Sequence, residues 1–259
     1  MLITTLGDLV LDIVVRLDEP LVPDDDRPAQ IVSCAGGQAA NVAAWAHALG
    51  AEARLVAHRG ADAAGRLAEE DIAARGVAIE GPVAGRGGIV VSIAANGDRT
   101  MASDRADGRH LHPDDLQDAW FASDVLHISG YTLHGEPGAS TAARAAELAR
   151  GHGARVSLDV ATWTLVDDTF RAHVAALAPD IVFATEQERD ALGDCGATWV
   201  VKLGADGIVA DGEPYPAVTV DVIDPTGAGD ALAAGYLVGG IEAGLAAAAR
   251  CCAKLGAMP

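Results

Sequence analysis

Residues 224–230 read Asp-Pro-Thr-Gly-Ala-Gly-Asp, and an Ala-rich segment follows them. The small residues Gly227, Ala228 and Gly229 stand where a helix is predicted to begin, so the backbone N–H groups there can approach an anion closely. Asp230 falls in the first turn of that helix. Such a carboxylate can accept a proton from an attacking hydroxyl while the loop stabilises charge on a transferred phosphoryl group. The alternative is a plain glycine turn with an ordinary acidic residue in the first helical turn.

Strand-like and helical segments alternate along most of the chain outside this motif. Short β-branched runs predict strands, and the Ala-rich segments between them predict helices. The predicted strands are residues 54–57, 125–128, 156–159, 181–183, 199–202, 207–210 and 217–222. The predicted helices start at Asn41 and cover 62–75, 140–150 and 186–192, and two helices of small residues end the chain. This alternation predicts an α/β fold with a mostly parallel sheet and helices on both faces.

Two stretches interrupt the alternation, at about 14–33 and 87–103. The second is typical of a hairpin, because strand-like residues lead into Asn96-Gly97 and the chain returns through Arg99. Strands inserted outside the alternation predict a small β-sheet lid over the carboxyl ends of the main sheet, where ligands bind in such folds. We therefore expect one domain over residues 1–259, with a lid formed from these two stretches.

Composition excludes several kinds of partner. The chain has 259 residues, with 18 Lys and Arg against 37 Asp and Glu, and its net charge of -19 disfavours nucleic acid and anionic membranes. The four cysteines form no Cys-x-x-Cys pair, so a reducing cytoplasm is expected. Asp8 and Asp12 in the apolar start argue against a signal peptide, and we expect no segment to be apolar enough to span a bilayer.

Two further motifs indicate a site for a hydroxylated ligand. Gly36-Gly37-Gln38-Ala39-Ala40-Asn41 combines paired glycines, which allow close backbone approach, with an amide that donates to and accepts from hydroxyls. A glycine turn with an N-capping Asn41 is the alternative interpretation. The apolar start of the chain also predicts a buried strand, which ends at Gly7-Asp8. Asp12 follows it at the carboxyl edge of the sheet, where its carboxylate can accept from a substrate hydroxyl, and a solvated loop Asp is the alternative.

Together these motifs resemble the ribokinase-like, or PfkB-type, carbohydrate kinases over almost the whole chain. Residues 36–41 resemble the amino-terminal signature of that family, and 224–235 resemble its carboxy-terminal signature. The resemblance implies a three-layer α/β/α domain with a β-lid, and ATP-dependent phosphorylation of a hydroxyl on a small sugar or sugar acid. It implies ATP and Mg²⁺ as cofactors, with a monovalent cation such as K⁺ as a further candidate. A nucleoside kinase, or a non-catalytic nucleotide- or sugar-binding sensor of the same fold, stays open.

The resemblance also implies roles for individual residues. Asp230 would be the general base, and Gly227, Ala228 and Gly229 would form the anion hole. The residues expected to bind substrate are Asp12, Gly36, Gly37 and Asn41, with Arg99 and Arg105 at the return of the lid. The residues expected to bind nucleotide are Lys202, Gly204, Gly207, Thr226, Gly227 and Gly229. A role for Arg105 would favour an acidic sugar.

One family motif is altered in this chain. The Asn-x-x-Glu motif associated with Mg²⁺ appears as Thr185-Glu186-Gln187-Glu188, so its Asn is missing. Glu188 is the expected residue near the metal, and an alternative register would put Gln187 there. The lid also suggests a homodimer, because apolar residues such as Ile89 or Val90 would be exposed on its outer face in a monomer.

Overall fold

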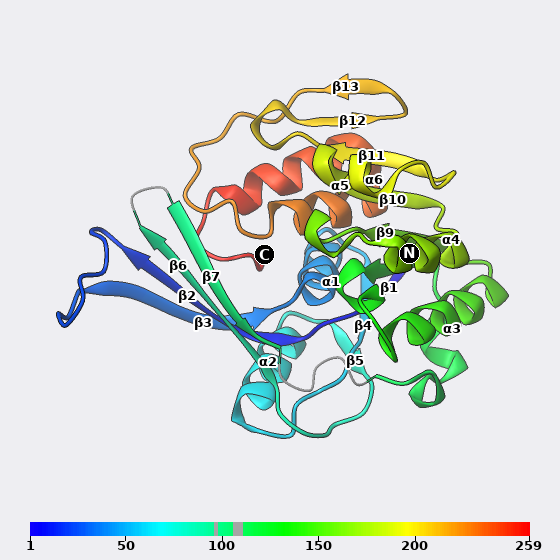
Figure 1. The fold of residues 1–259 in the computed structure, drawn as a ribbon, viewed down its shortest axis with the longest axis horizontal. Coiled ribbons are helices and arrows are strands. Elements are labelled where there is room, and N and C mark those ends of the chain that lie inside the picture. Colours follow the sequence, from blue (N-terminus) through cyan, green and yellow to red (C-terminus); the bar gives the residue numbers. More distant parts are fainter. Residues whose placement is uncertain (96–97, 106–110) are drawn as a thin grey trace.

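A nine-stranded sheet forms the middle of the body of the molecule (Figure 1). The computed structural model describes residues 1–95, 98–105 and 111–259. The strand order is β13-β12-β11-β10-β9-β8-β1-β4-β5. The bounds are β1 Leu2–Leu6, β4 Glu52–Val56, β5 Ala78–Glu80, β8 Val125–Ser129, β9 Arg155–Asp159, β10 Ile181–Thr185, β11 Thr198–Lys202, β12 Ile208–Ala210 and β13 Glu213–Tyr215. The strands from β11 to β5 pair in parallel, so their carboxyl ends share one edge, while β12 and β13 add an antiparallel margin.

Helices cover both faces of this sheet. The α-helices are α1 Gln38–Ala48, α2 Ala63–Ala74, α3 Gly138–Gly151, α4 Asp168–Leu177, α5 Glu186–Leu192 and α6 Ala228–Cys252, and 3-10 helices span Pro113–Asp115, Asp118–Phe121, Gly130–Leu133, Trp163–Leu165 and Gly204–Asp206. One buried cluster, with Trp45 and Ile72, joins α1, α2 and α6 to one face of the sheet. A second cluster, with Phe170 and Val174, joins α3, α4 and α5 to the opposite face. The predicted three-layer arrangement is confirmed.

The start of α1 lies earlier in the chain than predicted. Gly37 is the N-cap, with φ 103° and ψ 140°, and α1 begins at Gln38. A glycine adopts this positive φ readily, so the turn is completed before Asn41 is reached. The Asn41 N–H donates to the Gly37 carbonyl at 2.8 Å, as an interior helical residue does. The N-capping interpretation of Asn41 is therefore wrong, and its side chain is available for other contacts.

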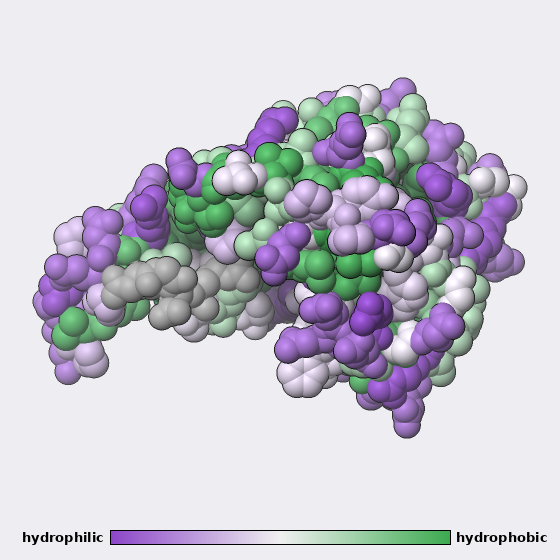
Figure 2. All heavy atoms as spheres, turned by 90° about the horizontal axis from the view of Figure 1, so that it is seen from above, coloured by the Kyte–Doolittle hydropathy of each residue, from purple (hydrophilic) through white to green (hydrophobic). Residues whose placement is uncertain are grey.

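A second sheet projects from the body as an arm, and we call this sheet the lid (Figure 1). Its strands are β2 Val10–Leu17, β3 Ala29–Gly36, β6 Gly88–Ala95 and β7 Asp98–Asp104, in the order β3-β2-β6-β7. The lid thus starts at Val10, four residues before the predicted stretch, and the predicted turn at 96–97 lies outside the described residues. Hydrophobic residues gather where the arm meets the body, whereas much of its tip is hydrophilic (Figure 2).

The apolar residues of the lid do not lie as expected. Val90 is 4% exposed and lines the cleft between lid and body, and Ile89 packs against the core. Side chains alternate between the two faces of a strand, so Val91 points away from the cleft that Val90 lines. The register places Ile13 beside Val91, and Val15 beside Ile31 and Ile93, on this outer face. The expectation that Val90 and Ile89 form an exposed apolar surface is therefore wrong.

The strand predicted at 217–222 is absent, because β13 ends at Tyr215 and residues 217–222 form a loop. Pro216 follows β13 directly, and proline has no N–H with which to continue a strand ladder. Val218 and Val222 are 49% and 62% exposed in this loop. Their β-branched pattern favoured a strand, but no neighbouring strand pairs with it.

The carboxy-terminal helix also differs from expectation. By length and composition α6 could span a membrane, contrary to the sequence-based view that no segment could. Half of its most apolar window is buried inside the fold, and it packs against α1. Gly240, with φ 80° and ψ -163°, breaks it into the two helices predicted. The buried half of this window contributes its apolar side chains to the core.

Candidate active site

A cleft of about 430 Å³ lies at the carboxyl ends of the parallel strands, between the lid and the start of α6. It brings together residues from both sequence motifs and from the intervening strands. The predicted site residues that line it are Asp12, Gly37, Asn41, Arg105, Glu188, Lys202, Gly204, Gly207, Thr226, Gly227, Ala228, Gly229 and Asp230. Gly36 does not line it, and the side chain of Arg99 lies outside the described part of the chain.

Asp230 and Asn41 connect the two motifs directly. The Asn41 Nδ2 donates to Asp230 Oδ2 at 2.7 Å, across 189 positions of the chain. Asn41 is 6% exposed, and its Oδ1 has no hydrogen-bond partner among the described residues. A buried carbonyl oxygen without a donor is costly, so this atom is suited to accept from a ligand hydroxyl.

The charge state of Asp230 is set by its surroundings. Burial, and after it the negative charge of Asp159, raise the pKa of Asp230 to about 8, although the hydrogen bond from Asn41 and the charge of Lys202 oppose this shift. A carboxylate with a pKa near neutrality is matched to proton transfer under physiological conditions.

The loop before α6 is held in a conformation that requires glycine. Gly227 has φ 78°, and a Cβ there would lie 2.4 Å from the Ala257 Cβ. The Asp224 carboxylate accepts from Thr226 N at 2.9 Å, from Thr226 Oγ1 at 2.5 Å and from Gly256 N at 3.0 Å. These bonds fix the loop so that the amino-terminal end of α6, with its partial positive charge, faces the cleft.

An ion pair that the sequence did not reveal stands beside this loop. The Lys202 Nζ donates to Asp159 Oδ1 at 3.0 Å and to Oδ2 at 2.8 Å. The Asp159 side chain is 1% exposed, and that of Lys202 is 17% exposed. Burial alone would lower the pKa of Lys202, but Asp159 and Glu188 hold it above its ordinary value. The ammonium therefore stays charged. Its Nζ lies 3.5 Å from the position that a Cβ on Gly229 would take, so it is close to the loop.

The lid side of the cleft holds the expected substrate residues. A Cβ on Gly36 would lie 2.1 Å from the Asp12 Cγ, so Gly36 makes room for Asp12 and does not itself face a ligand. The Arg105 Nη1 donates to Asp8 Oδ2 at 2.6 Å, and its guanidinium lies 4.0 Å from the ring centre of Tyr131. Arg105 is thus already paired, which weakens the expectation that it selects an acidic sugar.

Glu188, and not Gln187, reaches the cleft. Glu188 is 6% exposed, whereas Gln187 is exposed at the surface. The Glu188 Oε2 accepts from Thr185 N at 2.7 Å, and the Thr185 Oγ1 accepts from Glu188 N at 3.3 Å, so the altered motif forms a capping box for α5. Within the described ranges no group of three or more His, Cys, Asp or Glu side chains could hold a metal ion.

Several lining residues were missed by sequence reasoning, namely Asp8, Gln38, Tyr131 and Asp159. Asp8 and Asp159 directly follow or end predicted buried strands, and a charged residue at the carboxyl end of a parallel strand is a usable signal for a site. Tyr131 follows β8 in the same way. Gln38 accepts from Ser129 Oγ at 2.7 Å, a contact that only the fold brings about.

Comparisons with known proteins agree with this fold. A family model described as pfkB family carbohydrate kinase matches residues 2–258. An ATP-dependent ribose-1-phosphate kinase of Halopiger xanaduensis is 30% identical over 253 residues, covering 89% of this chain and 82% of that protein. A fructokinase of Klebsiella pneumoniae is 30% identical over 283 residues, covering 95% and 88%. The solved structure of adenosine kinase from Sinorhizobium meliloti superposes with a TM-score of 0.86 at 26% identity, covering 99% of this chain and 95% of that one.

Proposed function

Since the chain belongs to the pfkB family of carbohydrate kinases, it is a phosphotransferase that acts on a sugar hydroxyl, and we propose that Asp230 is its general base. The observation that carries this assignment is the 2.7 Å bond between Asn41 Nδ2 and Asp230 Oδ2, which joins the two motifs in one cleft. Asn41 Oδ1 and Asp12 would hold the acceptor, and Asp230 would take the proton of its hydroxyl.

The transfer would then proceed in line. The acceptor oxygen forms a bond to the γ-phosphorus of ATP while the bond to the departing ADP breaks, and the hydroxyl proton goes to Asp230. The Gly227-to-Gly229 loop at the start of α6 faces the developing negative charge. Lys202 lies at the same place and adds a full positive charge, held there by Asp159. Gly204, Gly207 and Thr226, which also line the cleft, would contact the nucleotide.

Magnesium fits this cleft as an ion shared with the nucleotide. Mg²⁺ binds to one or two carboxylates together with phosphate oxygens, and it neutralises phosphate charge during transfer. The buried Glu188 would hold it, directly or through water, and the absence of a larger ligand cluster among the described residues agrees with sharing. A dependence on a monovalent cation such as K⁺ is part of the same proposal, and it is tested by replacing K⁺ with tetramethylammonium in the assay.

We also propose a role for the lid, a dimer and a cellular location for the protein. The lid would close over the acceptor and exclude water from the phosphoryl group. Its outer apolar face, with Ile31 63% exposed, would pair with a second copy, and light scattering at micromolar concentration tests this dimer. We place the protein in the cytoplasm, because its four cysteines are unpaired and suit a reducing compartment.

An ADP-release assay with sugars, sugar acids and nucleosides as acceptors tests the proposed function. Turnover of at least one acceptor is expected, with Asp230→Asn losing it while retaining ATP binding. A sensor of the same fold is the rival class, and it would bind ATP or sugar without turnover. The Asp230 carboxylate disfavours the sensor function, since ligand binding alone needs no base beside the anion-binding loop.

A further inference from the structure

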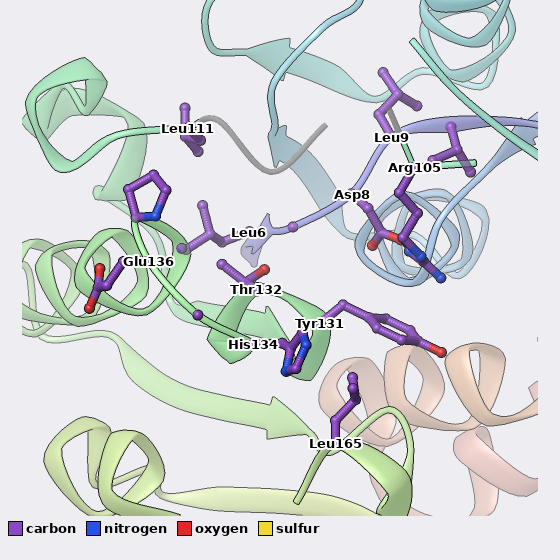
Figure 3. Close-up of a pocket in the computed structure, with 15 residues that line it drawn as sticks. Leu6, Asp8, Leu9, Arg105, Leu111, Tyr131, Thr132, His134, Glu136 and Leu165 are labelled. Atoms are coloured by element: carbon purple, nitrogen blue, oxygen red, sulfur yellow. The ribbon is translucent and has the colours of Figure 1, made fainter. Parts of the chain in front are cut away.

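A second cavity of about 400 Å³ adjoins the cleft (Figure 3). The two cavities share Asp8, Val10, Arg105 and Tyr131 in their walls, whereas Asp230 lines only the cleft. The second cavity, which we call the side cavity, is about as large as the cleft itself. An acceptor held with its reacting hydroxyl at Asp230 would therefore meet the side cavity at its opposite end.

The walls of the side cavity combine apolar and polar side chains, as ligand sites do. Leucines from three separate stretches of the chain line it, and six polar side chains line it as well, namely Asp8, Arg105, Tyr131, Thr132, His134 and Glu136 (Figure 3). These leucines are Leu6, Leu9, Leu111 and Leu165. Small-molecule sites combine mostly hydrophobic walls with a few placed polar groups, and the side cavity has both.

The charged groups of the side cavity do not favour an anion. The only described Arg or Lys in its wall is Arg105, and Asp8 neutralises this guanidinium at 2.6 Å. Those side chains are 23% and 11% exposed, so the pair is largely shielded from water. Glu136 adds a negative charge, with its Oε2 accepting from Ser140. A phosphate or carboxylate would have to break the ion pair and meet this carboxylate.

The junction between the cavities is suited to a flat group. Arg105 stacks over Tyr131 at 4.0 Å, and Tyr131 lines both cavities. In Figure 3 the Tyr131 ring and Leu165 approach the same side of the cavity. A planar ring placed here would contact one aromatic face and leucine side chains, which favours stacking over hydrogen bonding.

We propose that the side cavity binds an uncharged, flat ring carried by the acceptor at the end opposite its reacting hydroxyl. A ribofuranoside with an aryl or heterocyclic aglycone has this shape, because its 5-hydroxyl and its anomeric substituent lie at opposite ends of the sugar. This inference rests on the proposed function and narrows the acceptor from a free sugar to a riboside of this class.

Matched acceptors test the proposal in the full-length protein with Mg-ATP. Methyl and phenyl β-D-ribofuranoside differ only in the ring, inosine carries a heterocycle, and ribose 1-phosphate carries an anion. We expect kcat/KM for the phenyl riboside and inosine to exceed that for the methyl riboside by at least about tenfold. Equal values for phenyl and methyl ribosides, or a preference for ribose 1-phosphate, would overturn the inference.

A cavity-filling variant locates the effect. Leu165 is half-buried and lines only the side cavity, so Leu165→Trp should lower the phenyl-to-methyl ratio of kcat/KM at least about tenfold. Leu67→Trp is the matched control, because Leu67 is 52% exposed on α2 and lines neither cavity. An unchanged ratio in Leu165→Trp would overturn the inference, and Leu165→Phe provides the same test if the larger variant does not fold.

Binding measurements separate failure of this inference from failure of the proposed function. If no acceptor is phosphorylated, the proposed function is wrong. Calorimetric titration of the two ribosides without ATP then still tests the side cavity. Tighter binding of the phenyl riboside, lost in Leu165→Trp, would support the cavity assignment, and equal binding would refute it.

Discussion

Replacing either partner of the Asp159–Lys202 ion pair should move the pH dependence of the kinase reaction in opposite directions. Asp159→Asn removes a negative charge near Asp230 and leaves the Lys202 ammonium unpaired, so ionised Asp230 is stabilised and its pKa falls. Lys202→Met removes the positive charge and leaves the Asp159 carboxylate, so the pKa of Asp230 rises. Because Asp230 must be deprotonated to act as a base, the acidic limb of kcat/KM follows this pKa.

The size of the effect follows from the environment of Asp230. Burial, reinforced by Asp159, raises the pKa of Asp230 to about 8. At that pKa about one tenth of the molecules carry ionised Asp230 at pH 7, so kcat/KM of the unmodified protein should rise about tenfold from pH 6 to 7 and level off above pH 8. A unit charge several ångströms away contributes on the order of 1–3 kcal/mol, or about one to two pKa units.

The assay measures kcat/KM with both substrates below their KM, from about pH 6 to about pH 10. Its pH dependence reports the pKa values of the free protein. We expect the acidic limb of kcat/KM to move to lower pH in Asp159→Asn and to higher pH in Lys202→Met. In the double variant it should return to its original pH. The ion pair of Arg59 and Glu69, at 2.9 Å, lines neither cavity and provides the control through Arg59→Met and Glu69→Gln. If the ion pair were purely structural, both variants would lower the rate without shifting the acidic limb in opposite directions. A shift of the limb in the same direction in both variants, or no shift, would refute the electrostatic role.

Three further changes test the site. Asp230→Asn should lower kcat about 100-fold or more, while calorimetry should still detect ATP binding. The free energy of unfolding of this variant should exceed that of the unmodified protein at pH 9 but not at pH 4. The reason is that the raised pKa of Asp230 makes its ionised form destabilising as the pH rises from about 4 through 8. Gly227→Ala should lower the free energy of unfolding by about 1–3 kcal/mol in denaturant titration, because φ is 78° and the Ala257 Cβ lies 2.4 Å from the new methyl group. Glu188→Gln keeps an oxygen for the cap of α5 and should raise the Mg²⁺ concentration needed for half-maximal rate; an unchanged titration there, with Gln187→Ala impaired, would favour the other register.

Features that depend on neighbouring residues could be predicted from the amino-acid sequence. The alternation of β-branched and Ala-rich segments predicted the α/β body, because strand and helix periodicities are local properties. The motifs at 36–41 and 224–230 carry the glycines that their turns require, so they could be recognised without knowing what faces them. Residues 217–222 mark the limit of this reasoning, since a β-branched pattern forms a strand only where a partner strand is available.

Which charges and polar groups contact one another depends on how the chain is folded. Asn41 contacts Asp230 because α1 and α6 pack together, and Lys202 contacts Asp159 because β9 and β11 flank β10. Arg105 is paired with Asp8, which weakens the expectation that Arg105 selects an acidic acceptor. The amino-acid sequence shows that a residue is Asp or Glu, but it does not show whether the carboxylate is paired, solvated or desolvated. Its partner and its pKa depend on distances set by strand order and packing, and those distances exist only in the folded chain.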